Sequence, residues 1–176
     1  VAGDLPLVLP AEPAPHQRQL LALLGYTPDR FIGIRADELA EFSSLIVPSR
    51  LAAGGQYIDP MLPQWYRTRL VGQNPVVAHR KLYLTRAGTS RRRVANEEAV
   101  RAVLLKHGFE VVAPEALSVS EQIALFAQAT HIAGATGAAM TNMLFAPPGA
   151  VVTVFYNQHL AKGGGDLYFD AMARAC

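Results

Sequence analysis

The sequence predicts an α/β fold with a Rossmann-like parallel sheet and helices on its faces. Short apolar strands alternate with helical segments over connections of a few residues, which is the pattern of β–α–β units. Of the 176 residues, 51% are hydrophobic and 17% are charged, so the chain can bury a sizeable core. In parallel sheets of this kind, ligands bind at the carboxyl ends of the strands.

Turn residues separate the apolar segments of the first 58 residues. The expected elements are strands at residues 5–10, 30–35 and 43–49 and a helix at residues 16–26. Gly54-Gly55 and the prolines that follow mark a break. We therefore expect residues 1–58 to belong to a first domain and residues 59–176 to form a second, Rossmann-like domain.

The second domain has the clearer alternation, after a short connecting helix expected at residues 63–70. The expected strands are residues 81–86, 109–114, 130–135 and 150–156. The expected helices are residues 96–108, 118–129, 137–145 and 166–175.

The helix at residues 96–108 has recognisable ends. Asn96 is the expected N-cap, Glu97 suits the positive first turn, and Gly108 suits the helix end. The apolar periodicity predicts an inward face that consists of Val100, Val103 and Leu104.

Positive charge gathers in one part of the chain although the net charge is only +2. Residues 60–96 contain no Asp or Glu but eight of the 16 Lys and Arg residues. A field of this kind attracts anions. No interleaved aromatic residues accompany it, so a nucleic acid is not an expected partner. The histidines lack metal-ligand spacing, Cys176 is the only cysteine, and no apolar run could cross a membrane.

Two segments are candidates for binding a phosphate. Arg86 ends the strand at residues 81–86, and three more arginines (residues 91–93) follow in the next loop. A solvated basic loop and a phosphate cradle both remain open for this loop. After the strand at 130–135, Gly137, Ala138 and Ala139 leave backbone N–H groups accessible to a phosphate, or serve only close helix–sheet packing.

One acidic residue has a comparable position. Glu115 follows the strand at residues 109–114, where an acid often binds ribose hydroxyls in nucleotide-binding folds. A solvated turn residue after Pro114 is the alternative.

Taken together, these residues resemble the C-terminal part of family 61 glycosyltransferases. The matching string covers roughly residues 83–152 and reads "YLTR…RRVANEE…HGFEVVAPEALSVSEQIALFAQATHIAGATGAAMTNMLFAPPGAVV". The resemblance implies a GT-B arrangement, with a donor domain at residues 59–176 and the remainder of an acceptor-side domain at residues 1–58. It also implies inverting sugar transfer from a nucleoside-diphosphate donor to a glycan acceptor, with no metal and no other cofactor.

The resemblance assigns roles residue by residue. The diphosphate-binding positions of the family match Arg86, Arg92, Thr136, Gly137, Ala138, Ala139 and Asn142. Glu115 matches the nucleoside position, and Asn96-Glu97 and Gln122 fall on other motif positions. Thr136 replaces the usual histidine, Ala139 the second glycine, and Thr153 an acid of the last strand.

No catalytic residue can be assigned from these matches. We expect a truncated chain that binds a nucleotide but transfers little sugar by itself. A non-catalytic phosphate-binding module is the alternative. The resemblance implies a role in bacterial surface or capsular polysaccharide assembly, in the cytoplasm or at the inner face of the membrane.

Overall fold

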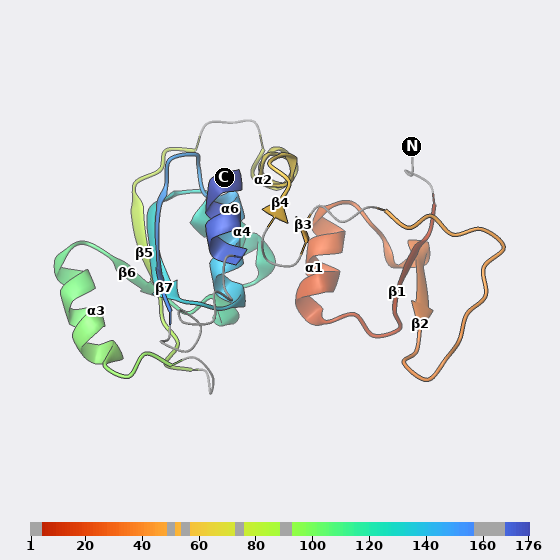
Figure 1. Ribbon diagram of the computed structural model, residues 1–176, viewed down its shortest axis with the longest axis horizontal. Coiled ribbons are helices and arrows are strands. Elements are labelled where there is room, and N and C mark those ends of the chain that lie inside the picture. The colour runs from red at the N-terminus through yellow and green to blue at the C-terminus, as the bar shows by residue number, and fades with distance from the viewer. Residues whose placement is uncertain (1–4, 49–51, 54–56, 73–75, 89–92, 157–167) are drawn as a thin grey trace. The chain divides into compact units, whose positions relative to one another are not determined.

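The computed structural model describes residues 5–48, 52–53, 57–72, 76–88, 93–156 and 168–176. The chain divides into two compact units (Figure 1). The first unit contains residues 1–49 and 118–120, and the second contains residues 50–117 and 121–176.

The first unit is built on one β–α–β element. Strands β1 (Leu7–Pro10) and β2 (Phe31–Ile34) pair in parallel, and helix α1 (Pro15–Leu23) connects them. A single 3-10 turn, η1 (Pro28–Arg30), leads into β2. These two strands and the helix confirm three of the four elements expected here.

The fourth expected element, a strand at residues 43–49, was wrong. The described residues 43–48 contain no strand, and Ile46 and Val47 are 68% and 77% exposed. An apolar run forms a strand only where a neighbouring strand completes its backbone hydrogen bonds.

A short antiparallel hairpin opens the second unit. It consists of β3 (Ala52–Ala53) and β4 (Tyr57–Ile58), which the sequence did not predict. Strand β4 packs on the C-terminal helix, and Ile58 is buried. These contacts place the hairpin in the second unit, ahead of the boundary expected at residue 58.

A four-stranded parallel sheet forms the centre of the second unit. Its strands are β5 (Arg80–Leu84), β6 (Glu110–Val112), β7 (Ala129–Ala135) and β8 (Val151–Phe155). They stand in the order β6-β5-β7-β8, which confirms the predicted α/β fold with parallel strands. Along the chain, β6 is added on one side of β5, and β7 and β8 are added on the other, so the direction of strand addition reverses between β5 and β7. Ligands of open α/β sheets bind at such a reversal.

Helices cover both faces of this sheet. The helical elements are α2 (Met61–Tyr66) with its π-helical continuation η2 (Arg67–Val71), α3 (Glu97–Lys106), η3 (Pro114–Ala116), α4 (Val119–Phe126), η4 (Ala138–Phe145) and α6 (Tyr168–Ala175). Helix α3 lies on one side of the sheet and α4 and α6 on the other (Figure 1). The helix expected at residues 137–145 is a 3-10 helix. In the described ranges, no helix is long and apolar enough to cross a membrane.

Helix α3 forms as predicted but differs in two details. Asn96 makes no side-chain capping hydrogen bond, and Val103 is 55% exposed rather than turned inward. The helix packs on the short edge strand β6, which offers it a narrow apolar surface. Gly108 ends the helix with a φ of +79°, a conformation that favours glycine.

The core lies between the sheet and the helices of the α4 side. Leu82, Leu84 and Ile132 point into it from the two central strands, and all three are buried. On the helices, Phe126, Met140, Met143 and Met172 are also buried. This core fixes the ends of β5 and β7.

Leu82→Ala is expected to lower the free energy of unfolding by about 2–5 kcal/mol, because it leaves a cavity in a fully buried site. Val103→Ala is the control and should change it by no more than about 0.5 kcal/mol. Urea unfolding followed by circular dichroism measures both. Equal losses would contradict the burial assigned to the two side chains.

Candidate functional site

The carboxyl ends of β5 and β7 lie side by side, because Leu84 and Gly134 are partners in the parallel register. Arg86 follows β5 and Gly137 follows β7. A methyl group placed on Gly137 would lie only 2.9 Å from Nη1 of Arg86. The structure therefore brings together the arginine and the glycine turn that the sequence predicted separately.

The N-terminal end of η4, with its first backbone N–H groups, lies next to this guanidinium. The first hydrogen bond within η4 runs from Met140 N–H to Gly137 O, at 3.0 Å. The N–H groups of Gly137, Ala138 and Ala139 precede that bond, and Ala138 is exposed. Thr136 is buried, and its N–H donates to Phe155 O at 3.1 Å.

The carboxylate of Glu97, the first residue of α3, accepts three hydrogen bonds from the end of β5. Its Oε1 receives the Thr85 hydroxyl at 2.6 Å, the Arg86 backbone N–H at 2.9 Å and the Tyr83 hydroxyl at 3.1 Å. The sequence indicates for Glu97 only a place in a helical first turn and a motif position. The one signal in the sequence was an acidic residue at the start of the helix that follows the strand expected at residues 81–86.

This cluster shifts two pKa values. Burial opposes ionisation of Glu97, but the hydrogen bonds from Thr85, Arg86 and Tyr83, together with the charge of Arg101, outweigh it and lower the pKa of Glu97. Burial and the neighbouring carboxylate raise the pKa of the Tyr83 phenol to about 12. Glu97 is thus an anion and Tyr83 a neutral donor at neutral pH.

Glu115 and Asn142 lie at the same edge of the sheet. Glu115 is exposed, and a methyl group on Gly88 would lie 3.5 Å from its Oε1, so it borders the loop that carries Arg86. Asn142 Nδ2 donates to Gln122 Oε1 at 2.8 Å. The Gln122 amide in turn donates to the carbonyl oxygens of Pro114 and Leu117, at 2.9 and 3.1 Å. Gln122 therefore connects η4 to the turn that holds Glu115.

Arg92 lies outside the described residues, and Arg93 is exposed. Their predicted roles stay predictions. Within the described ranges, no group of three His, Cys, Asp or Glu side chains could hold a metal ion.

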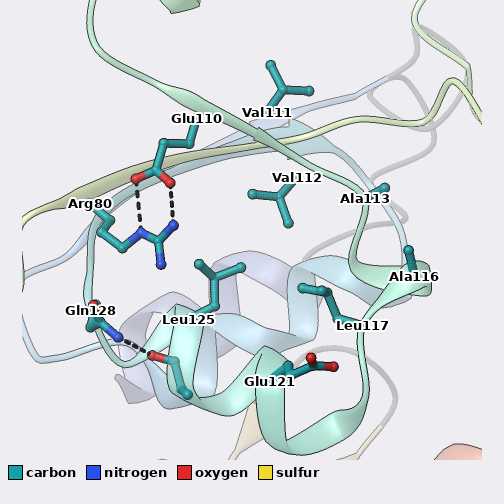
Figure 2. A pocket seen from close by; sticks show the side chains of 11 residues that line it. Arg80, Glu110, Val111, Val112, Ala113, Ala116, Leu117, Glu121, Leu125 and Gln128 are labelled. Carbon is teal, nitrogen blue, oxygen red and sulfur yellow. Dashed lines mark hydrogen bonds and ion pairs between the residues drawn. The ribbon is translucent and has the colours of Figure 1, made fainter.

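A pocket of about 540 Å³ lies elsewhere, between β6 and α4 (Figure 2). Arg80 and Glu110 face each other at one end and form a bidentate ion pair, with Nε 2.9 Å from Oε1. Val112, Leu117 and Leu125 form apolar walls. The Arg80 charge is matched by Glu110, so this pocket is a poor site for a diphosphate.

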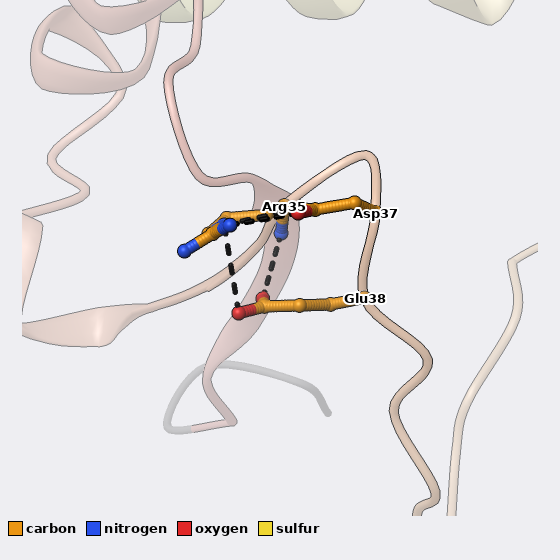
Figure 3. A network of polar contacts seen from close by, with 3 residues as sticks. All are labelled: Arg35, Asp37 and Glu38. Atoms are coloured by element: carbon orange, nitrogen blue, oxygen red, sulfur yellow. Dashed lines mark hydrogen bonds and ion pairs between the residues drawn. The ribbon is translucent and has the colours of Figure 1, made fainter.

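Arg35 of the first unit offers a comparison, since it also follows a parallel strand (Figure 3). Its guanidinium binds Asp37 through Nε at 3.1 Å and Nη2 at 2.7 Å, and its backbone N–H donates to Glu38 at 3.0 Å. Acids two and three residues away thus balance this arginine. The stretch around Arg86 contains no such acid before Glu97.

Gly137→Ala should leave the free energy of unfolding within about 0.5–1 kcal/mol of the parent, because only the flexible Arg86 side chain has to move. Gly134→Ala is the matched comparison. Its methyl group would meet Leu84 Cβ at 3.0 Å inside the core, and we expect a loss of about 1–3 kcal/mol. Urea unfolding of the two variants tests this difference, and a larger loss for Gly137→Ala would refute it.

The lowered pKa of Glu97 predicts an acid-dependent contribution to stability. A carboxylate with a depressed folded pKa stabilises the fold above its unfolded value near 4.5, and this contribution is lost as the pH falls through the folded pKa. The unfolding free energy of Glu97→Gln should therefore fall less than that of the parent between about pH 5 and pH 3. Parallel pH profiles for the two proteins would contradict the assignment.

Comparison with known proteins and protein families identifies a family for this chain. A family model described as Glycosyltransferase 61 matches residues 7–153. No curated protein and no solved structure matches the chain. The match spans both units and includes Arg86, Glu97, Glu115 and Gly137. The family's name indicates glycosyl transfer, with sugars and glycans as partners, and the chain belongs to glycosyltransferase family 61.

Proposed function

We propose that the second unit binds the nucleoside-diphosphate part of a sugar donor at the carboxyl ends of β5 and β7. The observation that carries the proposal is the contact between the Arg86 guanidinium and the Gly137 turn. The guanidinium lies beside the turn whose N–H groups precede the first hydrogen bond of η4. Both are donors suited to phosphate oxygens.

The proposal gives the remaining candidates supporting roles. Glu115 accepts ribose hydroxyls from the turn after β6, next to the loop of Arg86. Asn142 supports the site indirectly, because its amide donates to Gln122 and thereby holds η4 in place. Arg92 adds a second positive charge from the β5–α3 loop.

The proposed reaction is an inverting, metal-independent transfer in a GT-B enzyme. An acceptor hydroxyl of a glycan forms a bond to the anomeric carbon while the bond to the diphosphate oxygen breaks on the opposite face. The hydroxyl proton passes to a base on the acceptor side. Arg86, Arg92 and the N–H groups of Gly137, Ala138 and Ala139 stabilise the charge of the departing diphosphate.

A non-catalytic nucleotide-binding module is the second candidate. Burial of Thr136 favours it, because the motif histidine that the resemblance leads us to expect there is absent and the position faces the interior. The two candidates agree on nucleotide binding and differ on turnover. Release of nucleoside diphosphate from a bound sugar donor, in the presence of glycan acceptors, would exclude the module.

Calorimetric titration with UDP, GDP and ADP should give binding of one nucleotide that Arg86→Ala weakens by at least about tenfold. The reason is the loss of a charge-assisted hydrogen-bonding group, which contributes roughly 1.5–3 kcal/mol. Arg35→Ala removes a strand-end arginine that its own acids already balance, and should bind like the parent.

Two results would count against a donor site. One is equal binding by the parent and Arg86→Ala. The other is affinity for any polyanion that falls steeply with salt and does not respond to competing nucleotide. Arg92→Ala, measured in parallel, tests the role proposed for that residue.

A further inference from the structure

The backbone N–H of Arg86 donates its hydrogen bond to a side chain and not to a neighbouring strand. The N–H of Thr85 still donates to Val112 O of β6, at 2.9 Å. One residue later, the Arg86 N–H donates to Glu97 Oε1, also at 2.9 Å. The carboxylate of α3 thus continues the hydrogen bonding of the sheet by one residue, where the neighbouring strand has already ended.

This anchor determines where the guanidinium lies. The side chain of Arg86 reaches the Gly137 turn from a backbone position that Glu97 fixes. Displacement of the Arg86 main chain would therefore draw the guanidinium away from Gly137. The two other donors to Oε1, Thr85 and Tyr83, hold the carboxylate itself in place.

The arrangement favours a carboxylate over an amide. An ionised carboxylate only accepts hydrogen bonds, whereas a glutamine amide carries an NH₂ group and a less basic oxygen. Three donors converge on one oxygen here, and one of them belongs to the fully buried Tyr83. The negative charge also suits the first turn of α3 and the nearby Arg101.

We propose that Glu97 is a positioning residue for the donor diphosphate, acting through Arg86 and not by contact with the ligand. The inference rests on the proposed donor site. It extends that proposal by naming the residue that sets the place of its central arginine.

A double-mutant cycle tests the inference. Nucleotide affinity is measured for the parent, Glu97→Gln, Arg86→Ala and the double variant of the 176-residue chain. We expect Glu97→Gln to weaken binding on the order of tenfold in the parent and to have no further effect in the Arg86→Ala background. Equal effects in both backgrounds, or no effect in the parent, would overturn the proposal.

Glu38→Gln is the matched control. Glu38 also accepts the N–H of an arginine that follows a parallel strand, but it belongs to the first unit. It should leave nucleotide affinity unchanged. A loss as large as that of Glu97→Gln would mean that any such change disturbs the fold, and would overturn the specific role of Glu97.

A measurement without ligand separates this inference from the proposed function. Amide NMR spectra should show that Glu97→Gln shifts the Gly137 resonance and speeds hydrogen exchange at Arg86, while Leu82 stays protected. The Gly137 shift should be absent in the Arg86→Ala background. If Gly137 does not respond to Glu97→Gln, the inference fails even where nucleotide binds. If it responds but no nucleotide binds, the donor site fails and the positioning of Arg86 stands.

Urea unfolding verifies that each variant is folded. Should Glu97→Gln not fold, Glu97→Asp replaces it, because the shorter side chain keeps the charge but no longer reaches the Arg86 N–H. The same Gly137 shift is then expected, and its absence counts against the proposal.

Discussion

The space that Gly137 leaves open for Arg86 is the constraint on which the candidate site depends. Parallel pairing of β5 with β7 brings their carboxyl ends to one edge of the sheet. The two residues meet only because no side chain stands between them, with Nη1 of Arg86 2.9 Å from the place of a Cβ. Any other residue at position 137 would occupy the volume of the guanidinium.

The two glycines at the end of β7 serve different purposes. Gly134 lies against Leu84 and Met140, so its missing side chain permits close packing of η4 on the sheet. Gly137 makes room for a charged group instead. Packing and phosphate access were alternatives for the turn of Gly137, Ala138 and Ala139, and phosphate access there stays a prediction.

Local pattern predicted the four strands of the central sheet of the second unit, because each of them pairs with a neighbour in a contiguous sheet. It failed at residues 43–48, where a comparable apolar run has no strand beside it. It also failed at Val103, which is exposed because the short strand β6 offers α3 only a narrow apolar surface. The predicted strand ends also placed Arg86 and Gly137 separately at the carboxyl edge of the sheet. The three bonds to Glu97 could not be predicted, because they depend on where α3 begins relative to β5.

An acid next to an anion site would ordinarily weaken it, yet Glu97 is compatible with one. Its Oε1 carries the hydrogen bonds of three donors, so that oxygen is directed toward the β5 main chain and the buried Tyr83. The guanidinium of Arg86 extends toward Gly137 instead. In the first unit, by contrast, Asp37 takes the guanidinium of Arg35 and Glu38 its N–H. Both arginines are anchored by an acid, but at Arg86 the carboxylate of Glu97 accepts from the backbone N–H, while the side chain reaches the Gly137 turn.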